Sequence, residues 1–438
     1  MPNRYRWFVV GVFFCFMLLH QADKLLIGPL LSDIRAEFKI TESEAGLLGT
    51  GALIVGAVLY PLWGYLYDRF ARAKLLALAS AIWGLTTWFS AVARTFPLFL
   101  VARSSTGIDD SSYPGLYSLI ADYFPPSMRG KIYGALQLAI PLGYLLGLIL
   151  ALMLGPVIGW RNVFIVTGSL GIVLAFVIFF GVRDLPRGKA EPELADLPET
   201  TPIKFELKTA LALFRKRTLI PLFIQGFFGV FPLNIFSFWF FNYLETERGY
   251  KSDEVLPTMG IAVLMIAAGA FVGGASGDWL FKRSRRGRLL IAAAAVLLAT
   301  MLLIITLNVP ADSKLLFGVL LALTAFLILW SGPNVISTVY DITVPEVRST
   351  ALAIQYFIEQ LGAASAPLLV GLMAENLRLQ GHSTPLGTAI LVIGGGTYLA
   401  CGLFLLVAAL VVPRDIKALR DQLQQRADSI RAGDIPAN

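Results

Sequence analysis

The amino-acid sequence predicts an all-α membrane protein whose twelve transmembrane helices form two pseudo-symmetric bundles of six. The first supporting observation is composition: the 438-residue chain is 56% hydrophobic and 15% charged, whereas soluble domains average about 25% charged residues. The second is that apolar runs long enough to cross a bilayer, about 17–25 residues each, come in two sets separated by a polar linker. The third is that short motifs of the first set recur in the second.

The apolar runs follow one another with short connections. Those of the first half fall at roughly 7–31, 44–67, 75–93, 96–122, 131–155 and 162–182. Those of the second half fall at roughly 218–244, 255–281, 289–308, 315–340, 350–374 and 387–412. The first run follows two arginines, as in a signal peptide, but no small-residue cleavage site comes after it. We therefore expect it to be an uncleaved first helix.

The order of these runs divides the chain into four segments. An N-terminal six-helix bundle, 1–182, is followed by a cytosolic linker, 183–217, rich in charge and proline. A C-terminal six-helix bundle, 218–412, is followed by a cytosolic tail, 413–438. Apolar residues recur at helical spacing in the tail, which predicts a short amphipathic helix.

The distribution of Lys and Arg predicts the orientation in the membrane. With the N-terminus inside, the cytosolic segments hold 26 of the 36 basic residues and the outer loops hold eight. Such a positive-inside bias is typical of multi-pass proteins of the cell's inner (plasma) membrane. We expect both termini to be cytosolic. The net charge of +7 follows from this topology and indicates no nucleic-acid partner.

Two pairs of motifs indicate an internal duplication. Asp68 closes the second apolar run and Asp278 closes the eighth, 210 residues later, each following a glycine at the same spacing. An Asp and an Arg seven residues apart follow the fourth and tenth runs at an offset of 219. Duplicated transporters bind substrate near the midplane between their halves. The motifs supply our candidate gating residues, which are Asp68, Arg69, Arg72, Asp122, Arg129, Asp278, Asp341 and Arg348.

Ionisable residues lie inside two apolar runs of the first half. Arg103, Asp109 and Asp110 occur in the fourth run, and Asp23 and Lys24 in the first. A charge at such depth costs at least about 2.5–3.5 kcal/mol, so these residues usually face a polar cavity. The direction of the two runs places Asp23 and Arg103 in the same half of the bilayer, with Asp110 two turns deeper on roughly the Arg103 face and Asp109 turned elsewhere.

This cluster predicts proton coupling. Burial raises the pKa of a carboxyl group and a nearby guanidinium lowers it, so a change in water access lets the group bind and release a proton. Asp23 and Asp110 are the proton-coupling candidates, with Arg103 as their partner or as an anchor for an anionic substrate. The alternative is a static ion-pair cluster that only tethers the first and fourth helices.

Polar and aromatic residues of both halves are candidate substrate-binding groups. Alternatives exist for three of them: Lys24 could extend toward the membrane surface, His20 could be a packed polar residue or a proton relay, and Glu359 could hydrogen-bond across helices or titrate. The full set is Arg103, Lys24, His20, Asn234, Trp239, Trp330, Asn334 and Glu359. Charge on one wall and aromatic, amide and aliphatic groups on the other suit an amphipathic or anionic organic solute.

Several kinds of enzyme lack support in the sequence. Two His and two Cys leave little for a metal site or a disulfide framework. The chain has no GxxxxGK[ST], HExxH or GxSxG motif, which argues against an ATP-driven pump, a metalloprotease and a serine hydrolase. We expect no cofactor, no metal and no enzymatic activity.

Three motifs of the first half resemble those of the major facilitator superfamily. Gly64-Tyr-Leu-Tyr-Asp68-Arg69-Phe-Ala71-Arg72 resembles its GxxxDRxGR loop, with Ala71 in place of a glycine. Arg103-Ser-Ser-Thr-Gly107 resembles the RxxxG of its fourth helix, and Gly159-Trp160-Arg161-Asn-Val-Phe164 resembles its GWRxxF before the sixth. The resemblance implies a two-bundle transporter that works by alternating access.

Within the superfamily the chain looks most like bacterial spinster-type transporters. The matching pieces are Glu44-Ala-Gly-Leu-Leu-Gly49, Asp122-Tyr-Phe-Pro-Pro126, Ala139-Ile-Pro-Leu-Gly143, Val182-Arg-Asp-Leu-Pro-Arg-Gly188 and Val344-Pro-Glu-Val-Arg-Ser-Thr350. The resemblance implies proton-coupled export of lysophospholipids or related amphipaths, with roles for Asp23, Arg103 and Asp110. This chain has Lys24 where the family has Arg, Asp109 where it has Gly, and Asp110 where it has Glu. The organic anion:cation symporters, which the Tyr113-Pro114 pair also resembles, are the second family.

Three functions follow from these observations. The first is a proton-coupled carrier of an amphipathic or lysolipid-like solute, and the second is a proton symporter of small organic anions such as sugar acids. The third is a membrane receptor or lipid-handling protein without transport. In each case we expect a monomer whose partners are a small organic or lipid-like substrate, protons and membrane lipids.

Overall fold

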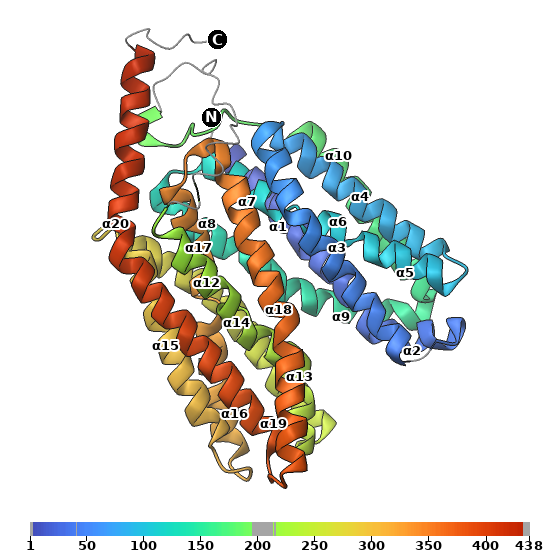
Figure 1. Cartoon of the computed structure of the whole chain (residues 1–438). Helices are drawn as coiled ribbons and strands as arrows, with labels where there is room; N and C mark the ends of the chain where they lie inside the picture. The colour runs from blue at the N-terminus through green and yellow to red at the C-terminus, as the bar shows by residue number, and fades with distance from the viewer. Residues whose placement is uncertain (1–2, 41, 195–212, 214–215, 432–438) are drawn as a thin grey trace.

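The computed structural model describes residues 3–40, 42–194, 213 and 216–431, and every regular element within these residues is helical. Two groups of helices, one from each half of the chain, meet at the end of the molecule that carries both termini and diverge toward the opposite end (Figure 1). We call these ends the terminal side and the far side. Most of the predicted linker, 195–212 and 214–215, lies outside the described residues, as do residues 432–438 of the tail.

Among the described residues, the first half contains ten helices in six membrane-length segments. They are α1 (Asn3–Leu25) with α2 (Ile27–Phe38), α3 (Glu42–Arg69), α4 (Arg72–Val92), α5 (Phe96–Ser105) with α6 (Gly107–Asp110) and α7 (Tyr113–Tyr123), α8 (Pro126–Gln137) with α9 (Ala139–Ile158), and α10 (Trp160–Gly181). The 3₁₀-helix η1 (Pro192–Leu194) lies in the linker.

The second half repeats this arrangement. Its elements are α12 (Leu219–Gly229) with α13 (Phe231–Thr246), α14 (Ser252–Phe281), α15 (Gly287–Leu307), α16 (Lys314–Ile328) with α17 (Ser331–Ile342), the 3₁₀-helix η3 (Pro345–Val347), α18 (Arg348–Leu379), α19 (Pro385–Ala389), the π-helical turn η4 (Ile390–Gly394) and α20 (Gly395–Arg431). Each predicted apolar run thus corresponds to one helix or one consecutive group of helices. Among the described residues, ten helical stretches are long and apolar enough to cross a membrane.

Proline explains why several segments consist of two or three helices. Proline has no N–H to donate and its ring clashes with the carbonyl four residues earlier, so a helix breaks just before it. The breaks before α7, α9, α13 and α17 each precede a proline by one to four residues; these prolines are Pro114, Pro141, Pro232 and Pro333. The same holds for the break between α1 and α2, which precedes Pro29.

The tail differs from its prediction. Instead of a separate short helix, α20 continues through Pro413 to Arg431. The predicted apolar stripe is present and buried at Ile416, Leu419 and Leu423. This extension packs against η1 of the linker, so the stripe covers the linker and the terminal side of the second half.

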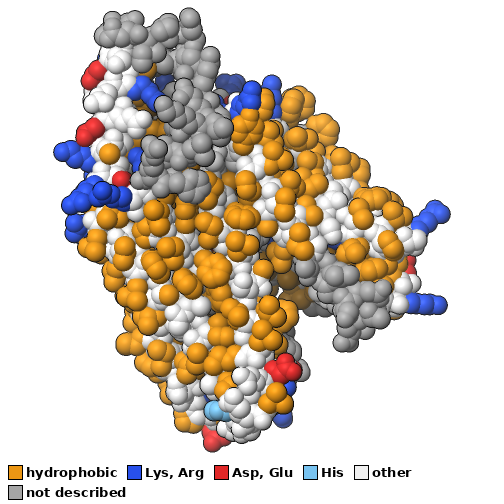
Figure 2. All heavy atoms as spheres, in the orientation of Figure 1, with side chains coloured by type: hydrophobic (Ala, Val, Ile, Leu, Met, Phe, Trp, Pro, Cys, Tyr) orange, Lys and Arg blue, Asp and Glu red, His pale blue; other side chains and the backbone are white. Residues whose placement is uncertain are grey.

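The outer surface is apolar along the length of the helices. In the space-filling view, hydrophobic side chains cover the sides of both halves and Lys and Arg gather near the ends (Figure 2). Exposed side chains such as Val157, Phe180 and Leu315 are 78–84% accessible. Large exposed apolar patches are rare on soluble monomers and mark surfaces that contact a membrane or a partner, which agrees with the predicted membrane protein.

The two halves touch through helices that are related by the internal repeat. Helix α3 packs against α18, and α14 packs against α8. The α8–α14 contact is close because it is made of glycines: a Cβ atom on Gly274 would lie 2.1 Å from the carbonyl oxygen of Gly130. Small residues allow helix backbones to approach in this way.

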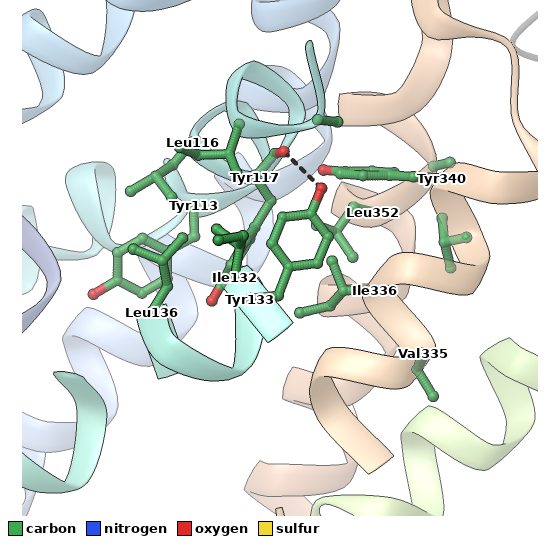
Figure 3. Close-up of a cluster of buried hydrophobic side chains, with 14 of the residues drawn as sticks. Tyr113, Leu116, Tyr117, Ile132, Tyr133, Leu136, Val335, Ile336, Tyr340 and Leu352 are labelled. Atoms are coloured by element: carbon green, nitrogen blue, oxygen red, sulfur yellow. Dashed lines mark hydrogen bonds between the residues drawn. The ribbon is translucent and has the colours of Figure 1, made fainter. Parts of the chain in front are cut away.

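Aromatic side chains seal the contact toward the terminal side. The rings of Tyr133 and Tyr340 pack edge to face with centroids 5.9 Å apart, and Figure 3 shows them meeting between the two halves. The Tyr133 hydroxyl donates to the carbonyl of Tyr117 at 3.1 Å, and the Tyr340 hydroxyl donates to the carbonyl of Pro114 at 3.1 Å. We call this contact the tyrosine layer.

Candidate functional site

A cavity of about 350 Å³ lies between the two halves and is lined by residues of both. The halves diverge around it toward the far side (Figure 1). Its lining combines aliphatic side chains with one ammonium group, two carboxylates, five tyrosines and six amides. These polar groups are Lys24, Asp110, Glu359, Tyr60, Tyr113, Tyr117, Tyr144, Tyr356, Gln21, Gln137, Gln225, Asn234, Gln355 and Gln360. Pockets of 300–1,000 Å³ with a few polar groups are typical binding sites for small molecules.

An ion pair between α1 and α6 lies on the cavity wall. The Lys24 ammonium donates to both carboxylate oxygens of Asp110, at 2.9 and 2.8 Å. The Lys24 side chain is 30% exposed and that of Asp110 is 7% exposed. The Asp110 backbone carbonyl accepts from the hydroxyl of Tyr60 at 3.3 Å. Asp110 therefore faces the cavity as expected, but its partner is Lys24 rather than Arg103.

A second ion pair lies inside the first half. Arg103 donates to Asp23 at 3.1 Å, and the same carboxylate accepts from the hydroxyls of Thr87 and Thr167 at 3.2 and 2.7 Å. The Arg103 guanidinium also lies over the ring of Phe164, 5.2 Å from its centroid. Both charged side chains are buried, and neither is among the described residues that line the cavity.

The pairing of Arg103 with Asp23 matches the expectation, whereas its separation from Asp110 does not. The predicted shared face assumed one continuous helix. The helix is interrupted between α5 and α6 at Thr106, so the rotation from Arg103 to Asp110 departs from the regular 100° per residue of an α-helix.

Asp109 belongs to a third polar cluster. Its carboxylate is 0% exposed and lies 2.5 Å from Nε2 of His20. The other ring nitrogen of His20 lies 2.8 Å from the Tyr113 hydroxyl, which also accepts from Gln21 at 2.9 Å. We had expected Asp109 to face away from the site; it faces α1 beside the cavity wall.

The second half contributes Glu359 and Asn234 to the cavity lining. Glu359 accepts from Gln355 at 2.8 Å. The other candidates of this half, Trp239, Trp330 and Asn334, lie outside the described lining. Trp239 donates to the carbonyl of Pro367 and Asn334 to that of Gly273, both at 2.9 Å, so these side chains stabilise helix contacts behind the cavity.

The candidate gating aspartates bind backbone amides across the two halves. Asp68, at the end of α3, accepts from the N–H groups of Ser349 and Thr350 at 3.0 and 2.6 Å. Asp278, at the end of α14, accepts from those of Gly130 and Lys131 at 3.1 and 2.7 Å. Ser349 and Thr350 lie in the first turn of α18, where free N–H groups and the helix dipole attract an anion.

The other gating candidates form ion pairs that repeat in the two halves. Arg72 binds Asp122 at 2.5 Å in the first half, and Arg288 binds Asp341 in the second. Arg129 lies 3.5 Å from Asp341 and Arg348 lies 3.7 Å from Asp122, so each of these arginines reaches a carboxylate of the opposite half. Arg69 is exposed and contacts Tyr65 of its own helix. Sequence reasoning missed Arg288 as a gating residue because it lies in a run of five basic residues at a loop.

Glu191 of the linker joins these pairs and was also missed. Its buried carboxylate binds Arg129 at 2.7 Å, Arg420 of α20 at 2.5 Å, and Arg348. Burial opposes ionisation, but the positive charges of Arg129, Arg348 and Arg420 outweigh it and hold the pKa of Glu191 well below its usual range. Nothing in the spacing of this proline-rich segment distinguishes Glu191 from the other linker acids.

Within the described residues, no group of three or more His, Cys, Asp or Glu side chains could hold a metal ion. The site therefore consists of a central cavity with ionisable walls, sealed on the terminal side by the tyrosine layer and by paired contacts between the halves. Two bundles of six segments around a central cavity are the architecture of duplicated membrane transporters.

Comparison with known proteins identifies the family. The profile of the Major Facilitator Superfamily matches residues 12–367, and the chain belongs to this superfamily. Protein spinster of Drosophila melanogaster is 31% identical over 87% of this chain, and the match spans 64% of the fly protein's length. The cis,cis-muconate transport protein of Acinetobacter baylyi is 29% identical over 90% of this chain and 92% of that protein. A sphingosine-1-phosphate transporter of Danio rerio is 25% identical over 89% and 82%.

Solved structures have the same fold. A bacterial homologue of the human lysosomal transporter spinster, inward-facing and occupied, matches with a TM-score of 0.57 and 19% identity over 95% of this chain and 98% of that one. The proton:xylose symporter XylE matches with a TM-score of 0.70 and 20% identity over 96% and 100%. The relatives confirm the resemblance to spinster-type transporters, and they are transporters rather than enzymes.

Proposed function

We propose that the chain is a proton-coupled secondary transporter that moves a small organic anion across the membrane together with protons. The observation that carries the proposal is the Lys24–Asp110 pair on the cavity wall, in which both carboxylate oxygens bind the ammonium group. Lys24 is the one Lys or Arg among the described cavity-lining residues. It is therefore the natural partner of an anionic substrate.

Proton binding and anion binding at this pair favour each other. While Asp110 is ionised it neutralises Lys24 and repels a second anion. When Asp110 takes up a proton from the cavity, the ammonium group loses its partner, and leaving it unpaired at a partly buried site is costly. A substrate carboxylate or phosphate restores the lost interaction. Because each ligand raises the affinity for the other, the pair supports symport.

The conformation also supports alternating access. Asp68, Asp278, the arginine–carboxylate pairs and the tyrosine layer hold the halves together on the terminal side. Rocking of one half against the other about the central site would break these contacts and expose the cavity to the terminal side. We assign the terminal side to the cytosol of a cell's inner membrane because most Lys and Arg fall in segments on that side. The cavity lies within one chain, so a monomer suffices.

The cavity favours a small anion over a long-chain amphipath, which reverses the order we expected from the sequence. The cavity volume of about 350 Å³ is near the lower end of ligand pockets, and five tyrosines and six amides line it beside the aliphatic side chains. A lysolipid-like anion remains the second candidate. The specific observation in its favour is the similarity to a sphingosine-1-phosphate transporter, whose named substrate also carries an anionic group.

Flux into proteoliposomes tests the proposal. The purified chain is reconstituted, and uptake of labelled cis,cis-muconate is measured with an inwardly directed proton gradient, without a gradient, and with an uncoupler. We expect accumulation only with the gradient, and competition by other small dicarboxylates. Accumulation of sphingosine-1-phosphate but not of muconate would favour the second candidate. If neither probe exchanges in counterflow, the reading as a receptor or lipid-handling protein without transport is favoured instead.

A further inference from the structure

The cluster of His20, Asp109 and Tyr113 has no role in the proposed symport at Lys24 and Asp110. His20 and Asp109 are 1% and 0% exposed and lie behind the cavity wall, whereas Tyr113 is part of that wall. His20 contacts Tyr113 through one ring nitrogen and Asp109 through the other. The three side chains thus form a chain of titratable groups from the cavity into the first half.

We propose that His20 and Asp109 form a second proton-binding site, separate from Asp110, which the cavity loads through the Tyr113 hydroxyl. The inference rests on the proposed function and adds to it a second transported proton. It assigns to Asp109 and His20 a role that depends on their contact with each other.

The surroundings of Asp109 favour a group that changes its protonation state. Among the described residues, the Asp109 carboxylate has one close side-chain partner, Nε2 of His20 at 2.5 Å, and no second side-chain donor. The hydroxyls of Tyr67 and Ser112 are buried nearby and interact with each other. A static structural carboxylate is normally fully hydrogen-bonded when buried. Asp23 is an example in the same bundle, with three donors on its two oxygens.

The balance of charges around the cluster indicates how many protons the His20–Asp109 pair binds. The other charged groups around the cluster cancel in pairs: Lys24 with Asp110, and Arg103 with Asp23. The remaining titratable groups facing it are tyrosines, Tyr113 of α7 and Tyr67 of α3, while α4 presents the uncharged ring of Trp83, 5.6 Å from that of His20. With His20 neutral and Asp109 ionised, the buried set carries one uncompensated negative charge. One added proton on the pair brings the total to zero, which low dielectric favours.

The hydrogen bonds define the path of that proton. Gln21 donates to the Tyr113 oxygen, so the tyrosine's own proton is free to point at Nδ1 of His20, and Nε2 then carries the hydrogen that faces Asp109. Loading transfers the Tyr113 proton to Nδ1 while cavity water gives a proton to the tyrosine oxygen. One proton leaves the cavity, the imidazole becomes an imidazolium paired with the Asp109 carboxylate, and Tyr113 is restored. Unloading reverses these transfers.

The coupling ratio tests the inference. In proteoliposomes with the membrane potential clamped at zero, the logarithm of the steady-state accumulation of cis,cis-muconate is plotted against the imposed pH difference. The slope equals the number of protons moved per substrate, and we expect about two for the wild type and about one for Asp109→Asn and for His20→Gln. His382→Gln is the matched control, since His382 is the chain's other histidine and is exposed in a loop. Its slope should equal that of the wild type.

The variant Tyr113→Phe distinguishes the path of the proton from the site that binds it. Removing the hydroxyl interrupts the path but leaves His20 and Asp109 in place. We expect proton-driven uptake to slow while the slope stays at the wild-type value. Equal slopes in the wild type, Asp109→Asn and His20→Gln would overturn the inference even with transport intact. An absence of any accumulation in the wild type would instead count against the proposed function.

A second measurement needs neither substrate nor the Asp109 and His20 variants, so it tests the inference even where those variants do not fold. In His382→Gln, all ¹⁵N-histidine signals come from His20. We expect the spectrum of this protein in lipid nanodiscs to show His20 changing from the neutral to the imidazolium form as the pH is lowered. A single protonation state across that range would contradict the inference. Asp109→Asn, if folded, should keep the neutral form throughout, because the imidazolium loses its counter-ion.

Discussion

At the residue scale, the ionisable groups of the first half act as three separate clusters. Asp23 and Arg103 are satisfied by each other and by two threonines in the interior of the bundle. Lys24 and Asp110 face the cavity, and Asp109 pairs with His20. Lys24 and Asp23 are adjacent in sequence, yet they point into different environments because successive residues of a helix differ by about 100° in direction.

This division predicts distinct effects for the two aspartates. Asp110→Asn keeps the size of the side chain but carries no transportable proton and no negative charge. We expect it to abolish accumulation driven by a pH gradient while retaining substrate exchange in counterflow, since the neutral side chain mimics the protonated state. Uptake and counterflow of cis,cis-muconate by the same vesicle preparation make the comparison. Loss of both activities in a protein that remains folded would point to a structural role.

For Arg103 we predict mainly a loss of stability. Arg103→Ala leaves the buried Asp23 carboxylate without its counter-ion, and breaking a buried pair in this way costs about 3–5 kcal/mol. Adding Asp23→Asn removes the unpaired charge and should recover a large part of that loss. Thermal unfolding of the two variants and the wild type in the same detergent measures this difference. If Arg103→Ala unfolds like the wild type while its transport is lost, Arg103 acts on substrate or protons and not on the fold.

At the element scale, the length and periodicity of the apolar runs predict the helical segments well. The direction of the site side chains is predicted poorly, because it depends on breaks within the helices. Every apolar run corresponds to helices, because long hydrocarbon-facing segments have few alternatives to helical hydrogen bonding. The positions of Asp109 and Asp110 depend instead on the break before α6, which changes the rotation between Arg103 and the two acids. Pro114 signals a break nearby, but its effect on the direction of each side chain follows only from packing.

The same contrast holds in the second half. Trp330 and Asn334 were chosen because polar and aromatic residues in an apolar run suggest a binding surface. In the structure, the side-chain amide of Asn334 donates to the carbonyl groups of Gly273 and Trp330, and the first of these bonds joins α17 to α14. Which face of such a helix meets the cavity depends on how the two bundles dock, and a single sequence does not encode that in any local pattern.

The contact of Asp68 with the first turn of α18 leads to a prediction about the rate of transport. The carboxylate binds two backbone N–H groups of the opposite half, and its charge is favoured by the helix dipole. Asp68→Asn should weaken closure of the terminal side and reduce maximal uptake of cis,cis-muconate, with its apparent affinity nearly unchanged because Asp68 is remote from the cavity lining. Asp278→Asn removes the repeat-related contact and is expected to behave alike. A large change in apparent affinity in either variant would contradict this role.

At the scale of the whole molecule, the terminal side contains one carboxylate, that of Glu191, which binds arginines of both halves. Arg129 of the first half and Arg348 of the second, 219 positions apart in the repeat, both bind Glu191. Arg420 brings α20 to the same group. The duplicated pairs Arg72–Asp122 and Arg288–Asp341 surround it. The linker thus contributes a fixed negative charge that stabilises the closed terminal side.

Replacing Glu191 should therefore shift the balance between the two open states. Glu191→Gln leaves Arg129 and Arg348 close together without the negative charge between them, and their repulsion favours separation of the halves on the terminal side. Pulsed electron resonance measures the shift as a distance between spin labels at Lys74 and Lys282, which are exposed on the terminal ends of α4 and beyond α14. The labelled protein carries Cys15→Ser, because Cys15 is exposed and Cys401 is buried. We expect the longer-distance population to grow in Glu191→Gln. A matched substitution at Glu193, whose ion-pair partner among the described residues is Arg420, should change it little.

The pH dependence of this distance follows from the lowered pKa of Glu191. A depressed pKa in the closed state means that the stabilisation is present above the usual glutamate pKa of about 4.3 and is lost only as pH falls through the lower value in the closed state. The wild-type distance distribution should therefore stay constant from neutral to mildly acidic pH. Glu191→Gln should differ from it across that whole range. If mild acidification opened the terminal side of the wild type as far as in Glu191→Gln, Glu191 would be taking up a proton during the transport cycle. Its charge would then not be fixed.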